Sequence, residues 1–166
     1  MAVESSDLKL YGSSSMPQND DDVNGGGINT GDEIVGVLGE VFTDAYSKDT
    51  GEGNYVQYRK VFFKNTNVSS SLTEAKIWVS ADPQNQIAIA VESSKNGSDT
   101  STNRLTAPGG YSFVDAASEE DAIAVPTGEL AAGEAIGVWV RLLIPEAQTP
   151  LSSVEAKLTI KGKTAA

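Results

Sequence analysis

The sequence predicts an all-β fold built from antiparallel sheets. Three observations lead to this prediction: about seven short runs of alternating apolar and polar residues, turn-forming clusters of Gly, Pro, Asn and Ser between the runs, and no segment with helical periodicity. A period of two gives a strand one apolar and one polar face, which is typical of antiparallel sheets covered on one side. The 166 residues suit one domain with an appended segment.

The expected strands occupy residues 55–65, 74–80, 87–92, 111–114, 122–125, 136–144 and 154–160. The alternation is plainest in 136–144, where the aliphatic residues Ile136, Val138, Val140, Leu142 and Ile144 share one face. Residues 127–134, which lead into this strand, resemble the approach to the penultimate strand of many immunoglobulin-like modules. The expected architecture is therefore an immunoglobulin-like antiparallel β-sandwich covering residues 34–166, with 34–42 as a possible first strand.

Residues 1–33 have a different composition. Residues 1–54 carry a net charge of −9 out of −11 for the whole chain, and residues 13–33 consist mainly of Gly, Asn, Asp and Ser. Such a segment has few groups to bury against the entropy cost of its ordering. We expect an extended N-terminal arm that becomes ordered against a partner, anchored by Leu8, Leu10 and Tyr11, with a solubilising tail as the alternative.

The composition argues against several classes of function. The chain has no Cys and no His, so thiol catalysis, imidazole catalysis and His- or Cys-ligated metals are absent. A net charge of −11 disfavours nucleic acids and anionic membrane surfaces as partners. The longest apolar stretch is too short for a transmembrane helix, and the first ten residues do not resemble a secretory signal. We therefore expect no enzyme activity, no nucleic-acid or membrane partner, and synthesis in a cytoplasm.

One acidic run partly matches a calcium-binding loop. Asp20, Asp22, Asn24 and Gly25 fit the opening of that template, but its twelfth position is Gly31 instead of Glu. Glu119, Glu120 and Asp121 are adjacent in sequence and lack the facing geometry of paired catalytic carboxylates. The sequence therefore predicts no metal site, no cofactor and no catalytic residue.

Trp78 and Trp139 each lie out of phase with the aliphatic face of their strand. If the aliphatic faces point inward, both indoles lie on outer faces and need a cover, because large exposed aromatic surfaces mark interfaces. A neighbouring subunit, the arm or a sugar would serve, and so would loops of the same chain. With a partner as the cover, Trp139→Ala would fold as a monomer and assemble poorly.

Six segments together resemble virion structural proteins of tailed bacteriophages, and most closely the capsid decoration, or cement, proteins. These segments are residues 8–17, 25–34, 58–67, 75–83, 106–113 and 128–145. The resemblance implies a small β-rich module on the outer capsid surface, often trimeric, that uses an arm to hold the major capsid protein. The apolar residues of the arm and the two out-of-phase tryptophans, Leu8, Leu10, Tyr11, Trp78 and Trp139, are the candidate residues of the partner surface. The alternatives are another virion component, such as a tail or fibre-associated protein, and a carbohydrate-binding or adhesive β-sandwich module.

Overall fold

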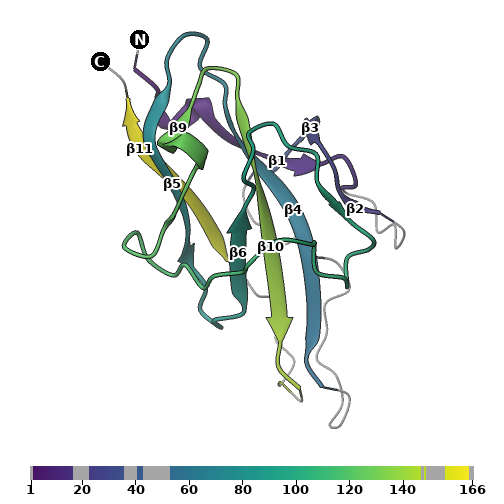
Figure 1. Ribbon diagram of the computed structural model, residues 1–166. Helices are drawn as coiled ribbons and strands as arrows, with labels where there is room; N and C mark the ends of the chain where they lie inside the picture. Colours follow the sequence, from purple (N-terminus) through teal and green to yellow (C-terminus); the bar gives the residue numbers. More distant parts are fainter. Residues whose placement is uncertain are drawn as a thin grey trace.

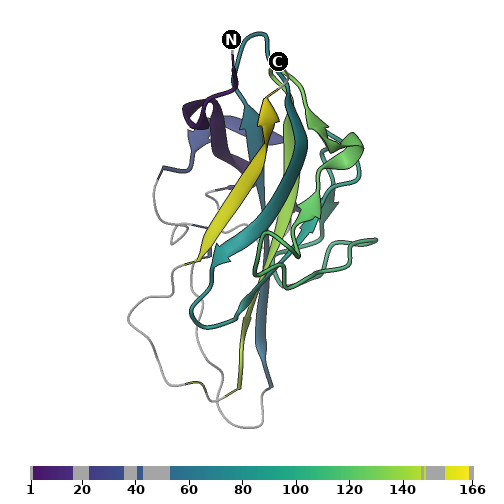
Figure 2. The same cartoon turned by 90° about the vertical axis from the view of Figure 1, so that its left-hand side faces the viewer.

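The computed structural model describes residues 2–16, 23–35, 41–42, 53–146, 148 and 156–164. Its strands form two antiparallel sheets packed face to face, together with a small two-stranded ribbon (Figure 1). The all-β prediction with antiparallel, sandwich-like packing is confirmed. Figure 2 looks onto the smaller sheet, whose strands β11 and β5 lie in front of β4 and β10 of the larger sheet.

The larger sheet has the strand order β3-β1-β4-β10-β6. Its strands are β1 (Leu8–Ser13), β3 (Ile28–Glu33), β4 (Tyr55–Asn65), β6 (Ile87–Val91) and β10 (Ala135–Ile144). The longest ladder joins β4 and β10 over ten residue pairs, from Ala135 opposite Lys64 to Ile144 opposite Tyr55. The sequence locates these two central strands almost to the residue, because each is long and alternates regularly.

The smaller sheet has the order β11-β5-β8, and β9 also pairs with β5. These strands are β5 (Leu72–Ala81), β8 (Ile123–Ala124), β9 (Glu129–Leu130) and β11 (Lys157–Thr164). Two short strands, β2 (Asn24–Gly25) and β7 (Thr100–Ser101), form the ribbon, and 3-10 turns cover Ser5–Asp7 (η1) and Pro126–Gly128 (η3). The run expected at 111–114 contributes only a bridge between Val114 and Ile89.

The core lies between the sheets. The aliphatic residues expected to share one face of β10 are all buried, and so are Ala75, Ile77 and Val79 of β5. They form one cluster with side chains from β4 and β6. Residues 114–125 close one side of the sandwich, because Val114 bridges to β6 and the backbone N–H of Val79 in β5 donates to Ala116 O.

The expected N-terminal arm is not a separate extended segment. Its residues 8–13 form β1, which pairs with β4 in a continuous register from Leu8 opposite Asn65 to Gly12 opposite Val61. Residues 28–33 form β3, which pairs with β1. The expectation of an arm ordered only against a partner is wrong for these residues, because strand pairing with β4 supplies the stabilisation that the segment's own composition lacks. Of the possible first strand at 34–42, residues 36–40 lie outside the described residues and the others are not in a strand.

Candidate functional site

The outer face of the larger sheet is covered by the chain itself. The segment that follows β6 crosses in front of β10 and β4, reaches β7 beside β2, and crosses back towards the smaller sheet (Figure 1). Asn96 fastens its beginning, because its N–H donates to Ala135 O and its Oδ1 accepts from Ala135 N. Near its end, the Phe113 ring packs against Tyr58, with ring centroids 5.2 Å apart. This segment, residues 92–114, is called the covering segment below.

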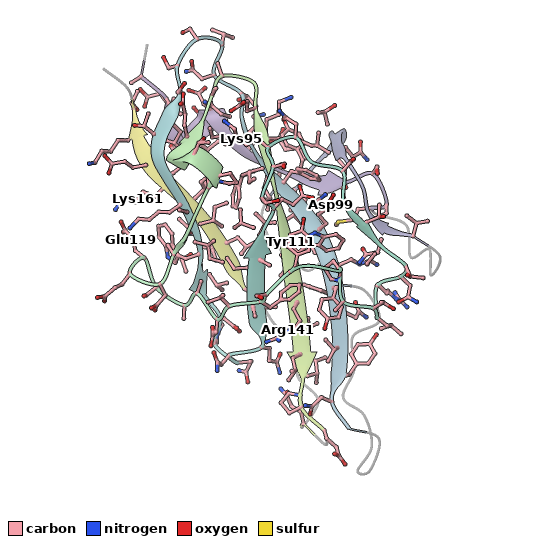
Figure 3. All side chains as sticks on the ribbon, viewed as in Figure 1. Lys95, Asp99, Tyr111, Glu119, Arg141 and Lys161 are labelled. Atoms are coloured by element: carbon pink, nitrogen blue, oxygen red, sulfur yellow. The ribbon has the colours of Figure 1, made fainter. Side chains whose placement is uncertain are left out.

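A group of five residues lies beneath and within the covering segment, and three of them, Lys60, Glu92 and Trp139, are buried. Three of them come from the sheet or its end, and two from the crossing itself. This outer-face cluster consists of Lys60, Glu92, Asp99, Tyr111 and Trp139. Figure 3 shows Asp99 and Tyr111 close together in front of the sheet, where the Tyr111 hydroxyl donates to Asp99 Oδ2.

Lys60 is the centre of this cluster. Its side chain is fully buried on β4, and its Nζ donates to Glu92 Oε1, to Gly26 O at 2.9 Å and to Asp99 O at 3.2 Å. Gly26 belongs to the N-terminal segment, and Glu92 and Asp99 belong to the covering segment, so one amino group ties both segments to the sheet. A lysine ammonium has three donors, and all three are used here.

Aromatic rings and glycines surround the pair formed by Lys60 and Glu92. Lys60 Nζ lies 4.8 Å from the Phe62 ring centroid and 5.6 Å from that of Trp139. A Cβ at Gly137 would lie 2.1 Å from Glu92 Oε2, and one at Gly97 would lie 2.6 Å from the same atom. These two positions therefore leave room for the Glu92 carboxyl only because they are glycine.

Burial dominates the electrostatics of the cluster. It lowers the pKa of Lys60 and raises that of Glu92, and the attraction between the two groups opposes both shifts. Burial also raises the pKa of Tyr111, and the hydrogen bond to Asp99 raises it further. A buried pair of this kind depends on mutual contact, since either group alone would be costly to desolvate.

Trp139 lies on the outer face of β10, as the strand parity predicts, but its side chain is 0% exposed. Tyr111 covers it at a centroid distance of 6.1 Å, and a Cβ at Gly25 would lie 2.5 Å from its Cη2. The expectation that a partner covers Trp139 is therefore wrong, and the alternative of cover by the same chain is correct. Trp78 is 9% exposed and packs with the main core cluster.

The other three residues expected on a partner surface also pack within the chain. Leu8 and Leu10 are partly buried against the main core. Tyr11 is buried in a small outer cluster with Phe62 and Ala135. The structure brings Leu8 and Leu10 together on one strand face, packed against the core cluster that also contains Trp78, but does not join them to Trp139.

Leu8 and Leu10 line an open groove of about 650 Å³ on the side of the sandwich opposite residues 114–125. Its apolar lining includes Leu8, Leu10, Ile34, Val35, Phe63, Ala156 and Leu158. On its rim Lys9 and Glu33 form an ion pair at 2.8 Å. Within the described residues, β3 and β11 are the outermost strands of their sheets beside this groove.

The acidic residues considered in the sequence analysis lie in different parts of the chain. Glu119 pairs with Lys161 at 2.8 Å on the exposed surface, and the hydrogen bond from Lys161 lowers the pKa of Glu119 (Figure 3). Asp20 and Asp22 lie outside the described residues, whereas the Asn24 amide donates to Tyr58 O and Ser101 Oγ. The described residues contain no group of three carboxylates placed to hold a metal ion, and no helix among them is long and apolar enough to cross a membrane.

The sequence analysis missed Lys60 and Glu92. The available signal was parity: on β4, Lys60 lies opposite Trp139 in register, between the aromatic residues Tyr58 and Phe62 of the same face. A charge flanked on its strand face by two aromatic residues indicates a buried partner.

No family model, no curated protein and no solved structure matches this chain.

Proposed function

We propose that this chain is a non-enzymatic structural protein of a tailed-phage virion, which decorates and stabilises the capsid exterior by binding the major capsid protein. Six segments of the sequence resemble proteins of that class. The structural observation that supports the proposal is the open apolar groove beside β3 and β11. It offers a binding surface on a sandwich whose opposite side and large outer face are closed by the chain itself.

The groove suits an extended segment of a partner. Outermost strands carry backbone N–H and C=O groups that can pair with an added strand, and a groove between two sheets can receive its side chains. Leu8, Leu10 and Phe63 supply apolar contact, while Lys9 and Glu33 supply polar contacts at the rim. The proposed occupant is a strand of the major capsid protein.

Binding of this kind would stabilise a shell through mass action, because the decoration protein binds the assembled shell better than its free subunits. Repetition over a shell, and association of the chain into a homo-oligomer such as a trimer, would strengthen attachment through multivalency. The proposed location is the capsid surface, reached after synthesis in the host cytoplasm.

Among the alternatives, another virion component would use the same groove on a different partner. The carbohydrate-binding alternative, in the form that uses Trp78 and Trp139, finds no support, because a sugar needs an exposed ring face and both indoles are buried.

The test uses shells assembled from the major capsid protein encoded in the same genome, mixed with the purified full chain and sedimented. The expected result is co-sedimentation at a fixed ratio, with a higher unfolding temperature of the shells. Absence of co-sedimentation would contradict a role in capsid decoration, and binding to purified tails instead would favour the tail-associated alternative.

A matched pair of variants locates the surface. Val35 lines the groove and is 82% exposed, whereas Val68 is 84% exposed and does not line it. Val35→Asp should weaken shell binding by roughly tenfold or more, because it introduces a charge into an apolar contact. Val68→Asp should bind as the wild type does, and both should keep the wild-type unfolding temperature. Equal binding by the two variants would exclude the groove.

A further inference from the structure

We propose that Lys60 and Glu92 become joined by an amide bond between Nζ and the side-chain carboxyl carbon of Glu92 in the folded chain. This inference does not depend on the proposed function. It concerns the centre of the outer-face cluster, where two groups that can form an amide are held in contact and sealed from solvent.

The geometry meets the requirement of proximity. Lys60 is 0% exposed and Glu92 is 2% exposed, and Nζ donates directly to Oε1. Gly26 O and Asp99 O hold Nζ from other directions. Two reactants fixed in contact react as if at very high local concentration, which removes much of the entropic barrier of a bimolecular reaction.

The surroundings favour the reactive protonation states. The nucleophile in amide formation is the neutral amine, and the electrophile is the neutral carboxylic acid. Burial lowers the pKa of Lys60 and raises that of Glu92, so it shifts both groups towards these neutral forms. Phe62 and Trp139 beside Nζ contribute the apolar environment.

The step balances without an oxidant or a co-reactant. The amine lone pair attacks the carboxyl carbon, one N–H proton and the carboxyl hydroxyl leave together as water, and the new C–N bond replaces the C–O bond. Asp99 and Tyr111 form a hydrogen-bonded pair within the cluster. Both residues also line a surface hollow of about 510 Å³, which gives the released water a route to solvent.

The product fits the same space. The amide nitrogen keeps one hydrogen for Gly26 O or Asp99 O, and Gly137 leaves room for the link to pass over β10. The link would join β4 to the end of β6 across the strand between them. It would therefore keep β4 and β6 joined on either side of β10.

The test is the intact mass of the purified full-length wild-type chain, measured under denaturing conditions. We expect a mass lower than that of the sequence by one water, about 18 Da. Trypsin cannot cleave after an acylated lysine, so its digest should contain residues 60–64 joined to residues 77–95. Because this measurement is made on the wild type, it does not depend on whether any variant folds.

Two variants provide controls. Lys60→Met should have the full mass of its sequence, because the nucleophile is gone. Lys95→Met, which removes a lysine paired with Glu134 at 2.7 Å, should retain the loss of one water. A wild-type chain with its full sequence mass after prolonged incubation would overturn the proposal and establish an ion pair. A loss of water that maps to any other pair of peptides would overturn it as well.

Discussion

At Trp139, strand parity and burial give separate information. Parity places the indole on the face opposite Val138 and Val140, and the structure agrees. Whether that face is exposed to solvent depends on residues far away in the sequence, namely Gly25 and Tyr111. A residue on the outer face of a sheet is therefore part of a second, smaller packed region.

This placement sets the stability expected of Trp139→Ala. Removing a fully buried indole deletes its packing and leaves a cavity, so the free energy of unfolding should fall by ~3–5 kcal/mol. Denaturant unfolding followed by circular dichroism measures the change. Leu105→Ala, at a side chain that is 55% exposed, is the control and should change little. A Trp139→Ala chain as stable as the wild type would mean that a partner, and not the chain itself, covers this face.

At the scale of elements, periodicity predicted the long strands and composition misled about the short ones. β4 and β10 alternate over ten residues or more, and the sequence locates both. β1 ends in Gly12 and Ser13, and β3 contains Asn29, Gly31 and Asp32. They are strands because β4 offers an unpaired edge to β1 and β1 then offers one to β3. The pairing of β1 with β4 joins residues about fifty positions apart in the sequence, from Leu8 opposite Asn65 to Gly12 opposite Val61, so no local pattern reveals it.

The same reasoning explains how much of the site could be predicted. The parity of Trp139 follows from local alternation, whereas Leu8 and Leu10, expected on a partner surface, pack against the core of the same chain. The Lys60–Glu92 contact depends on β10 lying between β4 and β6, with a glycine at position 137. Strand order is a property of the whole sheet, and the sequence pattern does not contain it.

Deletion of residues 1–33 tests the role of β1 and β3. The deletion removes two of the five strands of the larger sheet, the Leu8 and Leu10 contacts with the core and the Gly26 acceptor of Lys60. We expect the unfolding temperature to fall by roughly 10 °C or more, or cooperative unfolding to disappear. Lys9→Ala, which breaks only a half-exposed ion pair on β1, should have a small effect. A truncated chain that unfolds as the wild type does would restore the idea of a separate arm.

At the scale of the whole molecule, charge is distributed unevenly. The chain is strongly acidic, yet its outermost strand β11 carries Lys157, Lys161 and Lys163. Lys161 and Lys163 pair with Glu119 and Glu74 on the exposed surface of the smaller sheet. Lysines on an outermost strand also discourage unwanted pairing with other chains.

Acidification should remove the contribution of the Glu119 pair. The pKa of Glu119 in the folded chain lies below the ordinary value of 4.5. The ion pair therefore stabilises the fold above about pH 4.5, and this stabilisation is lost as the pH falls through the folded pKa of Glu119. Lys161→Met should therefore unfold at a slightly lower temperature than the wild type at pH 7, and the difference should vanish at pH values well below 4.5. Lys157→Met, at a lysine without an ion pair among the described residues, is the control and should show no such pH-dependent difference. A Lys161→Met difference that persists in acid would assign the effect to something other than the carboxylate.

The chain has two tryptophans, and they lie in different packed regions: Trp139 beneath the covering segment and Trp78 with the main core. Indole emission depends on the polarity around the ring, so each tryptophan reports separately on its own region. With Trp78 replaced by Phe, the remaining emission would follow local opening of the outer-face cluster, which can occur at a lower free energy than global unfolding. The protein thus carries a built-in fluorescent probe at the point where the N-terminal segment, the covering segment and the central strands meet.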